Sequence, residues 1–259
     1  MFLLHVSWLE SILDLIFPET QVCTFCWTEI EGRGSRGICS KCAKEILGMS
    51  ERFVTCSRCG HFIIGKTCPN CYDWTFEIDG VLSVVPYEGV YKEKIFDLKY
   101  NGKKELAVAL GYLMACRAKH SLLEKRDIYV VPIPLHPLRE EERGYNQSAL
   151  LARVVARELN CRYEESMLRR RNYEKSQTFL GRKERRANIK SAFEVTSCGI
   201  LKAQNILLVD DILTTGATMV SAAAVLRKAG AKRIFGLTWA TGFDKQLFTG
   251  QTFVEISRK

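Results

Sequence analysis

The sequence predicts an α/β fold, in which a parallel sheet with helices on both faces follows a small cysteine-rich domain. Apolar strand-like runs alternate with helix-like segments between residues 80 and 240, an order typical of parallel sheets. One run is followed by two acids and a hydroxyl-rich turn, at the kind of strand end where such sheets bind ligands. Four CxxC pairs lie before residue 72 and indicate structural metal sites.

Residues 1–20 predict an amphipathic leader helix. The segment has neither a basic start nor a small-residue cleavage site, so we expect no signal peptide. No run of 18 apolar residues occurs in the chain, so we expect no transmembrane segment. Docking on the rest of the chain is the favoured role of this helix, because its polar face has too few Lys and Arg for a membrane-surface helix.

Residues 21–75 predict a double zinc ribbon. Each CxxC pair offers half of a tetrahedral zinc site, and consecutive pairs would complete two structural sites. Interleaved pairing, first with third and second with fourth, stays open. Four successive pairs without an export signal favour zinc in a reducing cytoplasm over disulfides or a redox role. The predicted ligands are Cys23, Cys26, Cys39, Cys42, Cys56, Cys59, Cys68 and Cys71.

Residues 76–259 predict the larger α/β domain. Its expected strands are residues 80–87, 127–135, 206–209 and 233–240, and its expected helices are residues 91–100, 103–119, 147–159 and 219–229. Parallel strands end at one edge of the sheet, so the segments after two of these strands would converge on one cleft. Residues 242–259 match no pattern.

The stretch 205–218, NILLVDDILTTGAT, has the most specific pattern in the sequence. An apolar strand ends at Asp210 and Asp211, and a turn containing Gly216 leads into a helix. A helix start offers backbone N–H groups to a phosphate, and the glycine lets the backbone approach it closely. Two carboxylates beside a phosphate suit the hydroxyls of a ribose, usually with magnesium. The Gly-Lys-Ser/Thr of nucleoside triphosphatases is absent.

This stretch resembles, at every position, the motif with which type I phosphoribosyltransferases bind 5-phosphoribosyl-1-pyrophosphate (PRPP). The resemblance implies a type I phosphoribosyltransferase-like sheet in which Asp210 and Asp211 hold the ribose hydroxyls. It also implies a 5′-phosphate site made by Thr214, Thr215, Gly216, Ala217 and Thr218.

Three further segments, at residues 98–103, 130–152 and 169–193, together with the cysteine pairs resemble the ComF family. These are phosphoribosyltransferase-like proteins tied to DNA uptake in naturally transformable bacteria. The resemblance covers essentially the whole chain and implies that Lys99 can reach the ligand, although a solvated helix lysine is the alternative. It also implies a pyrophosphate loop of Pro132, Ile133, Pro134, Leu135 and His136. Within residues 170–186 it implies a flexible basic loop that includes Gln177, Arg182, Lys183, Arg185 and Arg186.

The formal net charge of +9 is unevenly distributed. Residues 1–80 hold seven basic and ten acidic side chains, whereas the remainder holds 31 basic and 19 acidic ones, which suits polyanionic ligands. With the ComF resemblance, we expect a cytoplasmic protein that handles incoming single-stranded DNA and binds PRPP or a related phosphate. Its cofactors would be two structural zinc ions and magnesium, and competence-machinery proteins are candidate partners. The alternatives are an active phosphoribosyltransferase with an unknown acceptor, releasing pyrophosphate, and a PRPP-sensing adaptor.

Overall fold

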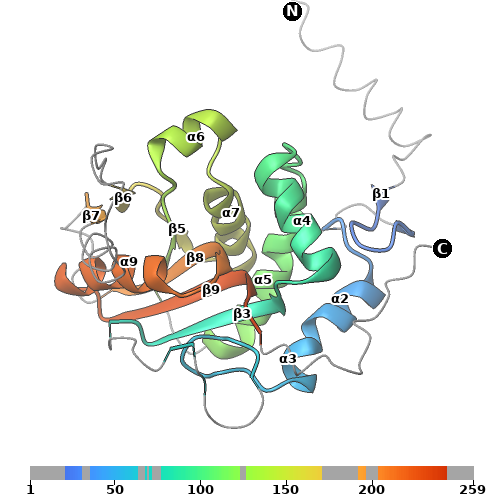
Figure 1. The fold of residues 1–259 in the computed structure, drawn as a ribbon, viewed down its shortest axis with the longest axis horizontal. Coiled ribbons are helices and arrows are strands. Elements are labelled where there is room, and N and C mark those ends of the chain that lie inside the picture. The colour runs from blue at the N-terminus through green and yellow to red at the C-terminus, as the bar shows by residue number, and fades with distance from the viewer. Residues whose placement is uncertain are drawn as a thin grey trace, which may run out of the picture.

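The computed structural model describes most of the chain around a central sheet (Figure 1). The described residues are 21–30, 36–63, 68, 70–71, 77–122, 127–170, 192–196 and 204–243. The expected leader helix and the expected basic-loop residues Gln177, Arg182, Lys183, Arg185 and Arg186 lie outside them. Among the described helices, none has the length and apolar character needed to cross a membrane.

The sheet has five strands, all parallel, in the order β3-β9-β8-β4-β5. They are β3 (Gly80–Pro86), β4 (Ile128–Pro132), β5 (Arg162–Tyr163), β8 (Asn205–Leu213) and β9 (Arg233–Thr241). The parallel sheet is therefore confirmed. The expectation that the central strand ends at the two acids is wrong, because Asp210 pairs with Thr238 and Leu213 with Thr241. The acids thus lie within the last part of β8 and not in a loop.

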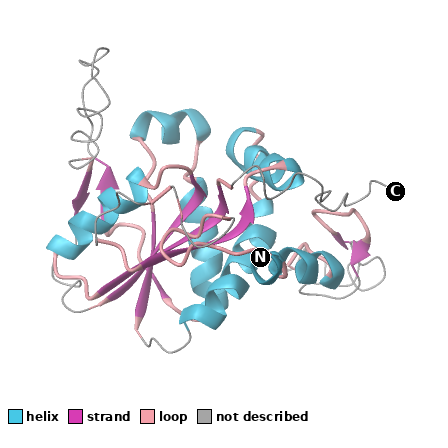
Figure 2. Ribbon diagram, turned by 60° about the horizontal axis from the view of Figure 1, so that its bottom comes forward, coloured by secondary structure: helices cyan, strands magenta, loops and turns pink. Residues whose placement is uncertain are grey.

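Helices cover both faces of the sheet, as the sequence predicted (Figures 1 and 2). Alternate residues of β8 show this: Leu207 and Val209 belong to one apolar core, and Ile206 and Leu208 to the other. The first core includes residues of α4 (Gly89–Tyr100), α5 (Leu106–Leu122) and α7 (Gln147–Leu159). The second includes residues of α9 (Ala217–Lys228).

The cysteine-rich part of the chain packs into these same two cores. It contains the short pair β1 (Gln21–Val22) and β2 (Glu29–Ile30), followed by α2 (Ser40–Leu47) and α3 (Met49–Arg52). In the first core the ring of Phe25 lies 6.1 Å from that of Trp239 in β9, which is fully buried. In the second core Cys59 is fully buried in the same cluster as Val81 of β3. The cysteine-rich part therefore shares its apolar packing with the sheet, and the boundary near residue 75 stays a prediction.

Three short elements near the carboxyl ends of the strands were not predicted. α6 (Pro137–Arg143) follows β4, and its first turn is capped by His136. β6 (Leu168–Arg170) and β7 (Phe193–Val195) form an antiparallel pair, in which Arg169 and Glu194 make an ion pair. This pair holds both ends of the segment that contains the expected basic loop.

Close packing of α5 on α7 depends on Gly111. A Cβ at this position would lie 2.7 Å from Cβ of Val154, which is closer than packed carbon atoms come. We expect Gly111→Ala to lower the free energy of unfolding by about 1–3 kcal/mol through overpacking. Urea unfolding of the purified variant measures this.

Val154→Ala in the same chain supplies the control, since it removes the atoms that the new methyl group would meet. The double variant should be more stable than Gly111→Ala alone. If the second substitution adds its own loss of stability, the two helices do not meet at this point.

Candidate functional site

Eight cysteines form two compact tetrads. Cys23, Cys26, Cys39 and Cys42 make the first, and Cys56, Cys59, Cys68 and Cys71 make the second. Within each tetrad all sulfur atoms lie within 4.8 Å of one another, and none is in a disulfide. The structure thus groups consecutive pairs, and the interleaved arrangement that the sequence left open does not occur.

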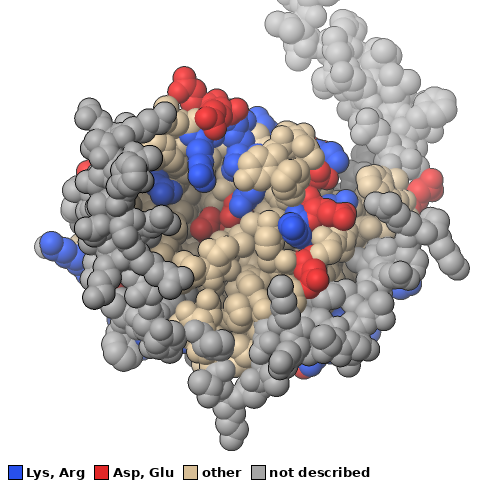
Figure 3. Space-filling model, in the orientation of Figure 1, with Lys and Arg blue, Asp and Glu red and all other residues tan. Residues whose placement is uncertain are grey.

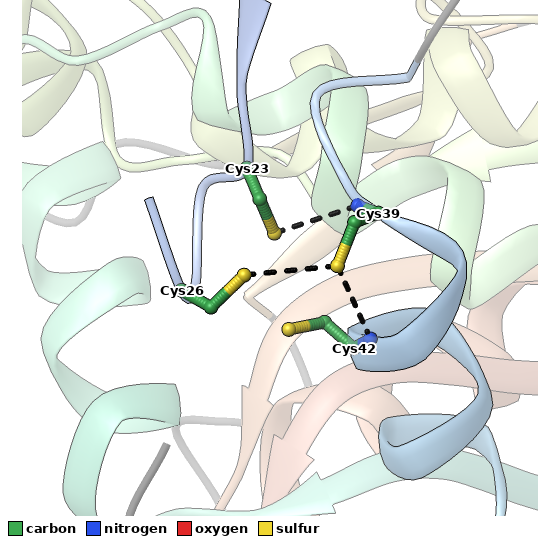
Figure 4. Close-up of side chains that lie close together, drawn as sticks. All are labelled: Cys23, Cys26, Cys39 and Cys42. Atoms are coloured by element: carbon green, nitrogen blue, oxygen red, sulfur yellow. Dashed lines mark hydrogen bonds between the residues drawn. The ribbon is translucent and has the colours of Figure 1, made fainter. Parts of the chain in front are cut away.

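The geometry of the tetrads fits zinc. Figure 4 shows the four thiols of the first tetrad pointing toward a common centre from the β1–β2 turn and the start of α2. The sulfur atoms of Cys26 and Cys39 are 3.7 Å apart, and those of Cys59 and Cys68 are 3.5 Å apart. A zinc tetrahedron with Zn–S bonds of about 2.3 Å has edges of about 3.8 Å. Burial raises the pKa of the Cys42 and Cys59 thiols, so a bound cation is needed to keep all four ligands as thiolates.

The second candidate site lies around Asp210 and Asp211, which have different partners. Oδ2 of Asp211 accepts a hydrogen bond from Nε2 of Gln147 at 2.6 Å and pairs with Nζ of Lys99 at 2.8 Å. The Asp211 side chain is only 6% exposed and that of Lys99 is 16% exposed, so this is a buried ion pair. Lys99 therefore reaches the site. This contact excludes the alternative that Lys99 is a solvated lysine on the helix surface.

Asp210 has hydrogen-bond donors but no cation within ion-pair distance among the described residues. Its Oδ1 accepts from the hydroxyl of Ser148 at 2.8 Å and from the backbone N–H of Asp211 at 2.9 Å. Burial and the adjacent Asp211 charge raise the pKa of Asp210 to about 7. Asp210 therefore changes its charge near neutral pH, whereas Asp211 is ion-paired with Lys99.

The first turn of α7 positions both acids and the loop beside them. Asn146 caps this helix through the backbone N–H of Ser148, at 3.0 Å, and donates from Nδ2 to the backbone carbonyl of Ile133, at 3.0 Å. The next two side chains, Gln147 and Ser148, bond to Asp211 and Asp210. All three polar residues are buried, so the start of α7 connects the end of β4 to the acids of β8.

The turn after β8 has the geometry of an anion site. Gly216 adopts the left-handed conformation, with φ of 74°. It occupies the N-cap position of α9, which starts at Ala217, and has no side chain with which to cap that helix. Thr214 and Thr215 are exposed, and Oγ1 of Thr215 accepts from the backbone N–H of Ala217 at 3.4 Å. A twelve-residue helix beginning here directs its first N–H groups and its positive dipole end toward the acids' edge of the sheet.

The loop after β4 lies at the same edge. The backbone N–H of Ile133 donates to the carbonyl of Val209 at 2.9 Å, so the loop leaves the sheet beside the strand that carries the acids. His136, a member of the expected pyrophosphate loop, has its Nδ1 engaged in capping α6, with the N–H of Leu138 at 3.3 Å. The convergence of the two segments that the sequence predicted is present in the structure.

Basic side chains border this edge of the sheet. Figure 3 shows a hollow with acidic atoms inside it and Lys and Arg along its rim near α6. Burial lowers the pKa of Arg170, at the end of β6, and the neighbouring charge of Arg139 in α6 lowers it further, while Asp210 opposes the shift. A bound anion would relieve the repulsion between these two guanidinium groups.

Sequence reasoning named Lys99 and the 210–218 turn but missed three side chains that hold the site. The sequence placed Gln147 and Ser148 in a helix and in the ComF-like segment 130–152, and Arg170 in the expected basic loop, without assigning any of the three a role. A signal for the first two is present: Asn146, Gln147 and Ser148 are consecutive polar residues at the start of an otherwise apolar helix. Polar residues that are buried at a helix start usually bond to a neighbouring element.

Comparison with known proteins gives one domain match and several curated relatives. Residues 146–242 match the family model described as phosphoribosyl transferase domain. Competence protein F of Haemophilus influenzae is 30% identical over 204 residues, which are 76% of this chain and 87% of that protein. DNA utilization protein YhgH of Escherichia coli K12 is 28% identical, over 78% of this chain and 88% of that protein. Competence protein ComFC of Bacillus subtilis is 29% identical, over 87% of this chain and 85% of that protein.

The tetrads generate a prediction about metal content and stability. We expect purified protein to contain two zinc ions, and Cys56→Ser to lose about one of them. Structural zinc contributes roughly 10–16 kcal/mol of apparent binding free energy in small zinc-binding peptides. Because Cys59 and its tetrad belong to the second core, we expect the variant also to lower the melting temperature of the sheet. Elemental analysis and thermal unfolding measure the two effects.

Cys161→Ser is the matched control, since Cys161 is a half-buried thiol outside both tetrads. It should keep both zinc ions and nearly all of the thermal stability. Fewer than two zinc ions in carefully purified wild-type protein would refute the assignment.

The two acids generate a prediction that separates their roles. Asp210→Asn should weaken PRPP binding and remove a pH-dependent loss of stability. The folded-state pKa of Asp210 is about 7 and that of an unfolded aspartate is about 3.9. The free energy of unfolding of the wild type therefore falls as pH rises between these two values, because Asp210 must ionise in the fold. The variant should therefore gain stability relative to wild type at pH 8 and gain least at pH 4. Urea unfolding at several pH values measures this.

Asp211→Asn is the comparison, because it leaves the partly buried Lys99 without a counter-charge. We expect it to lose about 3–5 kcal/mol of stability as well as ligand affinity. Equal stability of both variants at every pH would contradict the separation of roles.

Proposed function

The chain belongs to the competence protein F (ComF) family, and we propose on this basis that it is a cytoplasmic factor for DNA uptake in natural transformation. In this proposal it handles incoming single-stranded DNA and binds PRPP or a related phosphate at the carboxyl edge of the sheet. The relatives named for competence and for DNA utilization support the first part. The phosphoribosyl transferase domain match supports the second.

One observation carries the ligand proposal: a pair of acids stands next to a helix start that has a left-handed glycine. The free oxygens of Asp210 and Asp211 supply acceptors for ribose hydroxyls, and the turn from Thr214 to Thr218 supplies N–H groups for a 5′-phosphate. Arg139 and Arg170 would then face the pyrophosphate group. Each part of PRPP thus has a chemically matched neighbour at one edge of the sheet.

Magnesium fits the same donor set. Carboxylate oxygens and substrate phosphates are its usual ligands in proteins. A cation near Asp210 would favour the ionised carboxylate and so oppose the effect of Asp211 on its pKa. Binding of magnesium and PRPP should therefore release a proton near neutral pH and tighten as pH rises from 6 to 8.

Catalysis of phosphoribosyl transfer is a second candidate function, favoured by the two guanidinium groups beside Asp210. In such a reaction a nucleophile displaces pyrophosphate from C1 of the ribose. The departing group takes the bonding electrons, and positive side chains stabilise the charge that develops on it. Arg139 and Arg170 would serve in this way. A PRPP-sensing adaptor would need the binding geometry alone.

One calorimetric and turnover experiment separates these functions. Titration of the full chain with PRPP and magnesium tests binding, and pyrophosphate release across a panel of acceptors tests transfer. Binding without release would support the DNA-handling factor or the adaptor, and affinity for single-stranded DNA would then decide between these two. Absence of PRPP binding at pH 8 would refute the ligand proposal.

A DNA-binding role for the basic loop generates the next prediction. Residues 162–190 contain ten basic and four acidic side chains, and the paired strands β6 and β7 flank the expected basic loop in the sequence. Each phosphate contact with a single strand adds about −0.7 to the slope of log affinity against log salt. Replacing Arg182, Lys183, Arg185 and Arg186 by Ala should therefore flatten the slope by roughly two to three units if all four meet phosphates. Titration of labelled single-stranded DNA at several salt concentrations measures it.

Lys41→Ala with Lys44→Ala is the control, because these exposed lysines lie on α2, on the opposite side of the molecule from β6 and β7 (Figure 1). The control should leave the slope unchanged. If the loop variant also keeps the slope but binds PRPP more weakly, the loop is a lid of the phosphate site and not a DNA contact.

A further inference from the structure

Next to the carboxylate site, one surface combines exposed aromatic rings with cations. It lies on α4, where Lys92, Phe96 and Tyr100 are spaced four residues apart and therefore share one helix face. Phe96 is 47% exposed and Tyr100 is 63% exposed, which is unusual for large apolar rings on a folded protein. Their ring centroids are 4.8 Å apart. We call Tyr87, Lys92, Phe96 and Tyr100 the α4 stripe.

Each tyrosine near this surface carries a cation on its ring. Nζ of Lys92 lies 5.7 Å from the ring centre of Tyr87, and the guanidinium of Arg143 lies 5.0 Å from that of Tyr100. Beyond the stripe, Nζ of Lys104 lies 4.6 Å from the ring centre of Tyr145. Positive charge and aromatic surface therefore alternate along the helix and across to α6.

The stripe ends in a pocket of about 470 Å³ between the end of α4 and α6. Two tyrosine rings and three cations line it, and Glu142 is its one acidic wall residue among those described. Its lining residues are Lys99, Tyr100, Gly102, Arg139, Glu142, Arg143 and Tyr145. The hydroxyl of Tyr145 donates to the backbone carbonyl of Leu98, which fixes that ring against α4. A volume of this size suits one nucleotide or a similar small group.

We propose that the α4 stripe and this pocket bind a short segment of single-stranded DNA, with bases stacked on Phe96 and Tyr100 and one nucleotide in the pocket. The inference rests on the proposed function and gives the DNA a second binding surface in addition to the basic loop. A single strand presents what this surface matches, unpaired base faces and regularly spaced phosphates. Stacking needs no base-specific hydrogen bonds, so the surface would accept any sequence.

The charges favour a nucleic acid over a protein partner or a duplex. Asp97, an acid on α4, is already paired with Lys103 at 2.9 Å and with Nδ2 of Asn101 at 2.6 Å. Lysine is depleted at protein–protein interfaces, whereas here Lys92 lies on the same helix face as the exposed rings. A duplex keeps its base faces stacked inside and would leave Phe96 and Tyr100 unused.

The experiment is a titration of fluorescently labelled oligothymidylate with the full zinc-loaded chain. Loss of stacking costs roughly five- to 150-fold in affinity per base, so Phe96→Ala with Tyr100→Ala should weaken binding at least about tenfold. Phe96→Leu with Tyr100→Leu keeps apolar bulk and should weaken binding as well. Lys92→Ala should reduce the salt slope by about 0.7.

Trp27→Ala is the matched control, because Trp27 is also 63% exposed and also lies under a lysine, with Nζ of Lys94 at 5.0 Å from its ring centre. It follows Cys26 of the first tetrad and should leave the affinity unchanged. The inference is overturned if both α4 double variants bind as tightly as wild type, or if Trp27→Ala alone abolishes binding. Either result leaves the proposed function intact. Equal affinity for a duplex also overturns it. No binding by wild type removes the DNA part of the proposed function itself.

Discussion

The buried ion pair between Asp211 and Lys99 is the interaction on which the rest of the site depends. It joins β8 to the end of α4, and the hydrogen bond from Gln147 to the same carboxylate oxygen brings in the start of α7. Removing two charges from water is costly, and such a pair stabilises a fold only when further hydrogen bonds complete it. Gln147 supplies one of these, and its Oε1 in turn accepts from Arg143. Three elements are thereby fixed around one carboxylate.

That pairing explains why two adjacent acids behave differently. Lys99 supplies a counter-charge to Asp211, whereas burial and the neighbouring charge of Asp211 together raise the pKa of Asp210. Two adjacent carboxylates disfavour each other's ionised form unless a cation compensates one of them. The fold provides one such cation, at Asp211, and leaves Asp210 with hydrogen-bond donors but with no ion-paired cation among the described residues.

Much of this architecture was predictable from sequence, because its patterns are periodic or chemically specific. The cysteine pairs and the apolar run from Ile206 to Val209 each have one simple structural explanation. The extension of β8 through the acids was not predictable, since polar residues seldom continue a buried strand and the pairing with β9 is a long-range contact. The partners of Asp211 come from residues 112 and 64 positions earlier in the chain, and no local pattern reveals contacts over that distance.

Lys99 connects the acids of β8 to the pocket at the end of the α4 stripe. It pairs with Asp211 on one side and lines the pocket on the other. Its single positive charge is therefore shared between an acid of the proposed PRPP site and any phosphate bound in the pocket. A ligand that engaged Oδ2 of Asp211 would weaken the hold on Lys99 and increase the positive charge available to the pocket. Since coupling between two bound ligands is reciprocal, a nucleotide in the pocket would then favour the ligand at the acids to the same extent.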